Sequence, residues 1–164
     1  MPLSRSRAKI KTFKHLATLR QLWGWEGKQV VFTNGVFDIL HAGHLQLLER
    51  ARSLGDVLIV GVNSDASARR LGKGPGRPVN RLRDRAALLA ALWCVDAVVP
   101  FSEDTPERLL ARLRPDILVK GADYRKDRIA GARHAGRVIR VALKGGYSTT
   151  ALIRRLQSRA GREA

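Results

Sequence analysis

The fold of this chain is decided by the stretch Val30-Val-Phe-Thr-Asn-Gly-Val-Phe-Asp-Ile-Leu-His-Ala-Gly-His-Leu-Gln-Leu-Leu-Glu-Arg-Ala-Arg-Ser-Leu54. It begins with an apolar run over 30–32, continues through the turn-like 33–35 and ends in a helical pattern over 44–54. A strand, a small-residue loop and a helix N-terminus form an anion site, because free backbone N–H groups and the helix dipole point at the ligand. We therefore expect phosphate chemistry at this turn.

Two histidines, His41 and His44, lie three residues apart where the helical pattern starts. This spacing places both imidazoles on one face of the first turn, where they can donate hydrogen bonds to phosphate oxygens that gain charge as a P–O bond breaks. Gly43 between them lets a phosphate approach the backbone without meeting a Cβ atom. A helix cap is the alternative for either histidine alone. A zinc site is disfavoured because the other histidines and the single cysteine are isolated.

Length and composition indicate one domain. The 164 residues are enough for an independent core. We place this core at about 28–157 and a helical extension at 1–27. One cysteine excludes an intramolecular disulfide, no apolar run reaches about 18 residues, and the basic N-terminus lacks the apolar segment of a secretory signal. We expect a cytoplasmic protein with no membrane partner.

The net charge of +17 raises the question of nucleic-acid binding. The 31 lysines and arginines are scattered, however, and no aromatic residues interleave with them as a stacking platform requires. We therefore favour an anionic small-molecule substrate over a nucleic-acid partner.

Five apolar, β-branched runs predict a doubly wound α/β domain with a Rossmann-like, five-stranded parallel sheet. Each run is nearly continuous, as in strands buried on both faces, and helical segments between them imply right-handed crossovers. The expected strands are 30–32, 57–62, 95–99, 117–119 and 138–141. The expected helices are 13–23, 44–54, 83–92, 105–113 and 148–156, with Thr105 and Ser148 as N-caps and Pro106 at the first helical position.

Polar, glycine-containing motifs follow the expected strands at their carboxyl ends. Ligands of such sheets bind outside these ends, where the strand order reverses. The motifs cover 33–38, 63–65, 120–124 and 144–150. Among their carboxylates, Asp38 and Asp65 are better explained as organisers of a loop and a helix start than as magnesium ligands.

These motifs resemble the signature of the cytidylyltransferase-like nucleotidyltransferases. The resemblance covers about 10–157 and is carried by 33–44, 55–65, 76–80, Arg85, 95–101, 120–124 and 147–150. Within the family it is nearest to the adenylyltransferases that make ADP-heptose from ATP and D-glycero-β-D-manno-heptose 1-phosphate. It implies Mg²⁺-ATP as co-substrate, release of pyrophosphate and a homodimer. Many such domains follow a kinase domain, for which this chain has no room, so the resemblance implies a stand-alone form.

The resemblance also assigns roles to individual residues. The catalytic set is His41, His44 and Lys73, the last on the glycine-rich segment 71–78 that is suited to closing over phosphates. The nucleotide-binding set is Asn34, Gly35, Val36, Phe37, Gly43, Arg85, Gly121, Asp123, Ser148, Thr149 and Thr150. Lys73, Arg77 and Lys144 form the substrate-phosphate set, and no side chain is expected to bind metal directly. A solvated helix residue is the alternative for Arg85, and a surface lysine is the alternative for Lys73.

Other functions of the same fold stay open at this stage. Glycerol-3-phosphate cytidylyltransferases carry Arg-Thr-Glu-Gly before their Ser-Thr-Thr, whereas this chain has Leu143-Lys-Gly-Gly-Tyr147. This departure counts against CTP and glycerol phosphate. The nearer alternatives are a cytidylyltransferase or a FAD synthetase-like enzyme, and the more distant one is a non-catalytic nucleotide- or nucleic-acid-binding module. Trp23 and Trp25 precede the first strand, where a single domain has little core left to cover, and they also favour a homodimer.

Overall fold

The computed structural model describes residues 3–72, 74–122, 129–142 and 147–160. At its centre lies one parallel sheet with the strand order β3-β2-β1-β4-β5. The strands are β1 (Val30–Gly35), β2 (Val57–Asn63), β3 (Ala97–Phe101), β4 (Ile117–Gly121) and β5 (Arg137–Val141). This order confirms the predicted doubly wound, Rossmann-like fold. Because the order reverses between β1 and β4, a ligand crevice is expected at their carboxyl ends.

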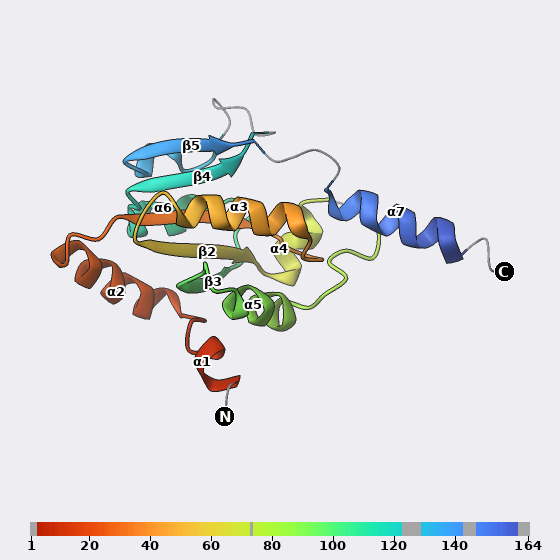
Figure 1. The fold of residues 1–164 in the computed structure, drawn as a ribbon, viewed down its shortest axis with the longest axis horizontal. Coiled ribbons are helices and arrows are strands. Elements are labelled where there is room, and N and C mark those ends of the chain that lie inside the picture. The colour runs from red at the N-terminus through yellow and green to blue at the C-terminus, as the bar shows by residue number, and fades with distance from the viewer. Residues whose placement is uncertain (1–2, 73, 123–128, 143–146, 161–164) are drawn as a thin grey trace.

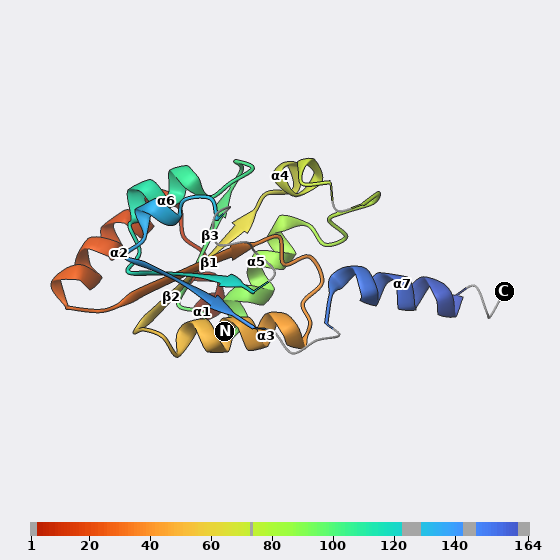
Figure 2. The ribbon, with the colours of Figure 1, turned by 90° about the horizontal axis from the view of Figure 1, so that it is seen from above.

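Helices cover both faces of the sheet. Figure 2 shows α2 (Phe13–Trp25) and α6 (Glu107–Leu113) on one side, with α3 (Ala42–Arg52) and α5 (Leu82–Ala91) on the other. The remaining helices are α1 (Leu3–Arg7), α4 (Asp65–Arg70), the 3₁₀ helix η2 (Ala132–His134) and α7 (Thr149–Ala160). In Figure 1, α7 projects away from the body on the side where the strands end.

Two apolar clusters, one on each face, explain why the strands are nearly continuous apolar runs. In β1, Val30 and Phe32 pack with the helices α2 and α6, whereas Val31 packs with α3 and α5. All three side chains are fully buried. Each side of the strand therefore needs apolar residues, as the sequence pattern predicts for a parallel sheet.

Most element boundaries differ from the predicted ones by one or more residues, and three of the differences concern β1, β3 and α6. Residues 33–35 continue β1 rather than forming a turn, because they pair with Val60–Val62 of β2. The third strand begins at Ala97, two residues late, since Asp96 uses its backbone and carboxylate to bond Leu58 ahead of the strand. Thr105 is not an N-cap. The cap of α6 is Pro106, which makes no side-chain cap bond.

Residues 9–11 of the N-terminal extension contact the outer edge of the sheet at β3. Ile10 forms an isolated parallel bridge with Val98 of β3, and the backbone groups of Lys9 and Lys11 bond Val98. An edge strand exposes unpaired backbone groups, so this bridge satisfies part of the edge.

Candidate active site

His41 and His44 form a stacked pair at the start of α3. Their ring centroids are 3.8 Å apart, with an angle of 19° between the ring planes. His41 is the N-cap, and its Nδ1 atom accepts a hydrogen bond of 3.3 Å from the backbone N–H of His44. In neutral His41 the ring proton therefore lies on Nε2, which can donate to a ligand. The structure thus combines the cap and the proposed donor in one side chain.

Burial lowers the pKa of His41 below the ordinary imidazole value. The environment therefore favours a neutral imidazole, which donates a hydrogen bond without being a permanent cation.

Close packing shapes the turn around this pair. Phe37 adopts a left-handed backbone conformation with φ of 49°, and its ring meets His44 edge-on with 5.2 Å between centroids. Gly43 needs to be glycine, because an added Cβ atom would lie 2.8 Å from Cβ of Tyr147. The segment before α7 therefore packs directly on the histidine turn, although more than 100 residues separate them along the sequence.

Arg85 supports the histidine turn from the interior of the domain. Its side chain is fully buried, and its three guanidinium nitrogens donate to Asn80 O, Val36 O and the carboxylate of Asp65. The sequence suggested either a phosphate ligand or a solvated helix residue. In the observed conformation the guanidinium supports the backbone of the motif, and Asp65 organises it together with the start of α5, where it accepts from Leu82 N–H.

Arg77 lies against the same turn through Asp38. The Arg77 guanidinium Nε lies 2.9 Å from the fully buried carboxylate of Asp38, which also accepts the backbone N–H of Asn80. The Asn80 side-chain amide donates in turn to the Asp38 carbonyl. Asp38 therefore organises the loop, in line with the sequence interpretation.

Two cavities meet at the carboxyl ends of the strands. The histidine cavity measures about 130 Å³, and its lining comprises Asn34, Gly35, Val36, Phe37, Asp38, His44, Leu47, Arg77 and Thr149. The second cavity, which we call the acceptor cavity, measures about 260 Å³ and is lined by Asn34, Gly35, Val36, Asn63, Leu71, Asp104, Thr105, Pro106, Lys120, Ile129 and Ala130. Three residues of β1 and its following loop, 34–36, line both. The two cavities therefore flank one segment at the reversal of strand order.

The remaining predicted residues fall into three groups. Ser148 caps α7, because its hydroxyl accepts the backbone N–H of Ala151, and Thr149 and Thr150 open the helix. Gly121 ends β4 beside the crevice. Lys73, Asp123 and Lys144 lie outside the described residues.

Lys120 is the residue that sequence reasoning did not assign. Its side chain is 6% exposed and its ammonium group donates to Asn34 Oδ1, so it lies between β4 and β1. The signal was present in the sequence, since a lysine inside an apolar strand is rarely buried without a role.

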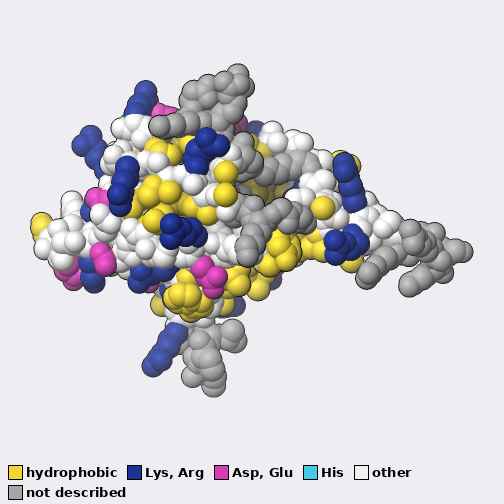
Figure 3. Space-filling model, turned by 45° about the horizontal axis from the view of Figure 1, so that its top comes forward, with side chains coloured by type: hydrophobic (Ala, Val, Ile, Leu, Met, Phe, Trp, Pro, Cys, Tyr) yellow, Lys and Arg dark blue, Asp and Glu magenta, His cyan; other side chains and the backbone are white. Residues whose placement is uncertain are grey.

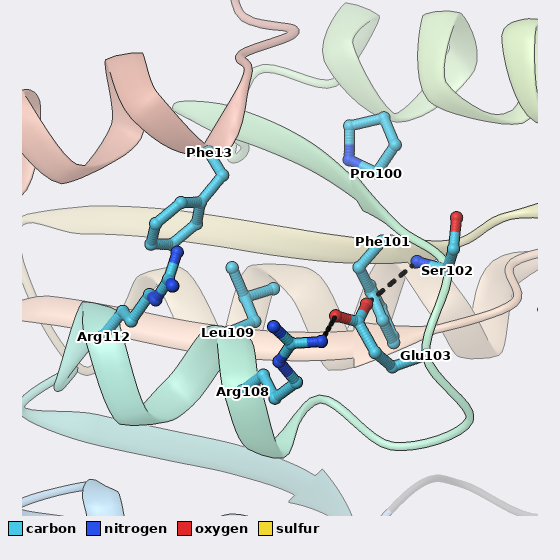
Figure 4. A pocket seen from close by; sticks show the side chains of 8 residues that line it. All are labelled: Phe13, Pro100, Phe101, Ser102, Glu103, Arg108, Leu109 and Arg112. Atoms are coloured by element: carbon cyan, nitrogen blue, oxygen red, sulfur yellow. Dashed lines mark hydrogen bonds and ion pairs between the residues drawn. The ribbon is translucent and has the colours of Figure 1, made fainter.

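A further cavity of about 280 Å³ lies away from the histidines, beside the end of β3 (Figure 4). Arg112 stacks over the Phe13 ring there, and Arg108 lies 3.8 Å from the carboxylate of Glu103. None of the predicted site residues lines it. The histidine and acceptor cavities are therefore the candidate active site.

A family model described as cytidylyltransferase-like matches residues 32–155. The chain belongs to the cytidylyltransferase-like family. The predicted family and the predicted class of enzyme, a nucleotidyltransferase, are confirmed by this match.

Curated relatives of this cytidylyltransferase-like chain include the bifunctional protein HldE of Mesorhizobium japonicum, 59% identical over 140 residues that make up 83% of this chain. The bifunctional protein HldE of Magnetococcus marinus is 51% identical over 154 residues, or 92% of this chain. The chain spans only 28% and 31% of the lengths of these two relatives.

Two solved structures resemble the fold. The lipopolysaccharide core biosynthesis protein from Thermoplasma volcanium is 31% identical with a TM-score of 0.63, and the match covers 72% of this chain and 99% of that one. Pantoate-β-alanine ligase from Francisella tularensis, in a complex described as containing β-γ ATP and β-alanine, is 17% identical with a TM-score of 0.60, and the match covers 84% of this chain and 67% of the ligase. The second likeness shows the fold alone.

One face of this cytidylyltransferase-like domain carries scattered positive charge. Figure 3 shows lysine and arginine side chains distributed over the visible face rather than gathered in one stripe. Among the described residues, no helix has the length and apolar character needed to cross a membrane. The same part of the chain contains no group of three or more histidine, cysteine or acidic residues that could hold a metal ion.

Proposed function

We propose that this domain transfers AMP from Mg²⁺-ATP to a sugar 1-phosphate, D-glycero-β-D-manno-heptose 1-phosphate, to form ADP-heptose and pyrophosphate. The observation that carries the proposal is the stacked pair His41 and His44, held at the start of α3 beside a cavity at the reversal of strand order. Support for a sugar phosphate comes from the motif resemblance and from the 31% identical lipopolysaccharide core biosynthesis protein.

The reaction joins two anions and needs no general base. An oxygen of the sugar phosphate attacks the α-phosphorus of ATP, and the bond from that phosphorus to the bridging oxygen breaks as pyrophosphate leaves. The imidazole N–H groups of His41 and His44 stabilise the charge that develops on the phosphate oxygens. The N-terminus of α7, with Thr149 at the histidine cavity, offers further N–H and hydroxyl donors to the phosphate chain.

Mg²⁺ would arrive with ATP. We expect this ion to keep waters and substrate phosphates as its ligands. When bound, Mg²⁺ neutralises charge on the triphosphate and helps pyrophosphate to leave. The residues of this chain then orient the phosphates and exclude competing water.

Additional cations are part of the proposal. We assign Lys73, Arg77 and Lys144 to the substrate phosphates, and Asp123 with Gly121 to the ribose or base. Of these, Arg77 lines the histidine cavity, where its contact with Asp38 holds it in place. Arg85 supports these groups from the interior rather than by touching the ligand.

A matrix of substrates tests the function. Pyrophosphate release is measured for each nucleoside triphosphate with heptose 1-phosphate, glucose 1-phosphate, glycerol 3-phosphate and FMN. We expect turnover with ATP and heptose 1-phosphate, and a loss of at least 100-fold for CTP with glycerol phosphate. Preferred use of CTP would indicate a cytidylyltransferase instead, and preferred use of FMN would indicate a FAD synthetase-like enzyme. Salt-sensitive binding of nucleic acid without any turnover would indicate a non-catalytic module.

A further inference from the structure

We infer that Lys120 holds the phosphate of the acceptor sugar, and that the acceptor cavity is the sugar subsite. This inference rests on the proposed function and deepens it. The acceptor cavity and the histidine cavity lie on the two sides of residues 34–36, so a ligand in each would meet over this segment. Such an arrangement suits an attacking group and an electrophile that must be brought into contact.

The position of Lys120 identifies the end of the acceptor that meets ATP. Its ammonium group donates to Asn34 Oδ1, and Asn34 lines both cavities. The positive charge therefore lies at the boundary between them rather than at the outer rim. A sugar 1-phosphate in the acceptor cavity would place its dianionic phosphate at this boundary, next to the α-phosphate of ATP.

A positive charge at this boundary would reduce the repulsion between the two phosphate groups that react. Two phosphate groups that approach within bonding distance repel each other, and the repulsion is largest where water is excluded. A lysine with 6% exposure keeps most of its electrostatic attraction because little solvent screens it.

The other residues that line the acceptor cavity suit a sugar. Asn63, Asp104 and Thr105 line the cavity with amide, carboxylate and hydroxyl groups, whereas Ile129 and Ala130 add an apolar side. Hydroxyl groups need such donors and acceptors, and the carbon face of a pyranose packs on apolar side chains. Asp104 is fixed by Arg70, whose Nε lies 2.6 Å from the carboxylate. The cavity therefore matches a polyhydroxylated ring with one terminal phosphate.

The test compares Lys120→Met and Lys120→Arg with Lys28→Met, an exposed lysine at the amino-terminal end of β1 that pairs with Glu26. We expect Lys120→Met to raise KM for the sugar 1-phosphate at least 30-fold and to leave KM for ATP within threefold. Lys120→Arg should recover part of the loss, and Lys28→Met should match the wild type. A rise confined to KM for ATP would overturn the inference, as would an unchanged KM for the sugar phosphate.

A second variant covers the case in which Lys120→Met does not fold, as judged by circular dichroism. Ala130→Trp places a bulky side chain in the acceptor cavity and keeps the lysine in the sequence, and it should raise KM for the sugar phosphate at least 10-fold with ATP use unchanged. Equal effects on both substrates would overturn the subsite. If the wild type shows no turnover, the proposed function fails, and calorimetry with heptose 1-phosphate alone then decides the inference. Binding lost in Lys120→Met but kept in Lys28→Met supports it, and no binding by the wild type overturns it.

Discussion

The backbone N–H of His44 donates to Nδ1 of His41 at 3.3 Å, so the side chain that caps α3 is the same imidazole to which we assign donation to the phosphates. The proposed function therefore gives one imidazole two roles, helix capping and transition-state donation. Two substitutions can separate the two roles, because asparagine caps helices well and does not reproduce the geometry of the imidazole N–H.

His41→Ala removes both roles, and His41→Asn removes only donation. We expect His41→Ala to lower the free energy of unfolding by about 1 kcal/mol, whereas His41→Asn stays near the wild type. Both variants should lower kcat by about 10²-fold or more, with little change in KM for ATP. Urea unfolding and steady-state kinetics measure these effects. If His41→Asn kept the kcat of the wild type, His41 would serve only as a helix cap and not as a donor.

The pH dependence follows from the lowered pKa of His41, which burial causes. A second proton on Nδ1 would break the bond from His44 N–H and would leave the ring charged. We therefore expect kcat to stay constant above about pH 6.5 and to decrease as the pH falls through a midpoint below that value. A midpoint above 6.5 would contradict the neutral donor.

The free energy of unfolding should also decrease as the pH falls. Because the folded chain binds this proton less readily than the unfolded chain, the contribution of His41 to the free energy of unfolding is complete above about pH 6.5. It is lost as the pH falls through the lowered pKa of the folded state. The difference in unfolding free energy between the wild type and His41→Asn, measured across this range, isolates the contribution.

Gly43→Ala tests the packing of the segment before α7 on the histidine turn. Alanine favours a helix, but its Cβ atom would lie 2.8 Å from Cβ of Tyr147 and 3.1 Å from Nδ1 of His41. We expect kcat to fall at least tenfold because the turn must shift. Gly43→Ala combined with Tyr147→Gly removes the first conflict and should recover part of the activity.

Gly24→Ala in α2 is the matched control for this glycine. An added Cβ atom there meets only the flexible end of Arg20, at 3.3 Å. This variant should keep full activity and gain up to about 1 kcal/mol in the free energy of unfolding, since it exchanges glycine for alanine within a helix. A similar loss of activity in both variants would argue against a specific role of the contact with Tyr147.

Much of this architecture could be predicted from the sequence because it depends on short-range patterns. Continuous apolar runs mark strands buried on both faces, and the spacing of His41 and His44 brings their rings together. Burial in three dimensions was harder to predict. Arg85 belongs to a motif rich in cations, and only the fold shows that its guanidinium bonds Val36 O inside the molecule. The contact between Lys120 and Asn34 could not be predicted from the sequence, because it forms only when β1 and β4 become neighbours in the sheet. These two strands are far apart in the sequence.

Arg85→Met decides between support and ligand binding. Removing the guanidinium leaves Val36 O, Asn80 O and the Asp65 carboxylate without this donor. We expect the free energy of unfolding to fall by about 3 kcal/mol, since breaking a buried ion pair leaves uncompensated groups. Arg83 lies two residues earlier in α5 and its side chain is 83% exposed. Arg83→Met should therefore change the free energy of unfolding by less than about 0.5 kcal/mol. A stable Arg85→Met that only loses ATP affinity would restore the role of a phosphate ligand.

The homodimer remains a prediction, and we place its interface at the C-terminal end of α2. Trp23 packs against the core beneath α2, whereas Trp25 is 84% exposed and Leu22 is 43% exposed. We expect sedimentation at micromolar concentration to show a dimer, and Trp25→Ser to shift it to a monomer. Trp93→Ser, at a 73% exposed tryptophan after α5, is the control and should leave the dimer intact. Because the chain carries a net charge of +17, copies repel each other at low ionic strength, so added salt should strengthen an apolar dimer. A wild type that sediments as a monomer at both low and high salt would exclude this assembly.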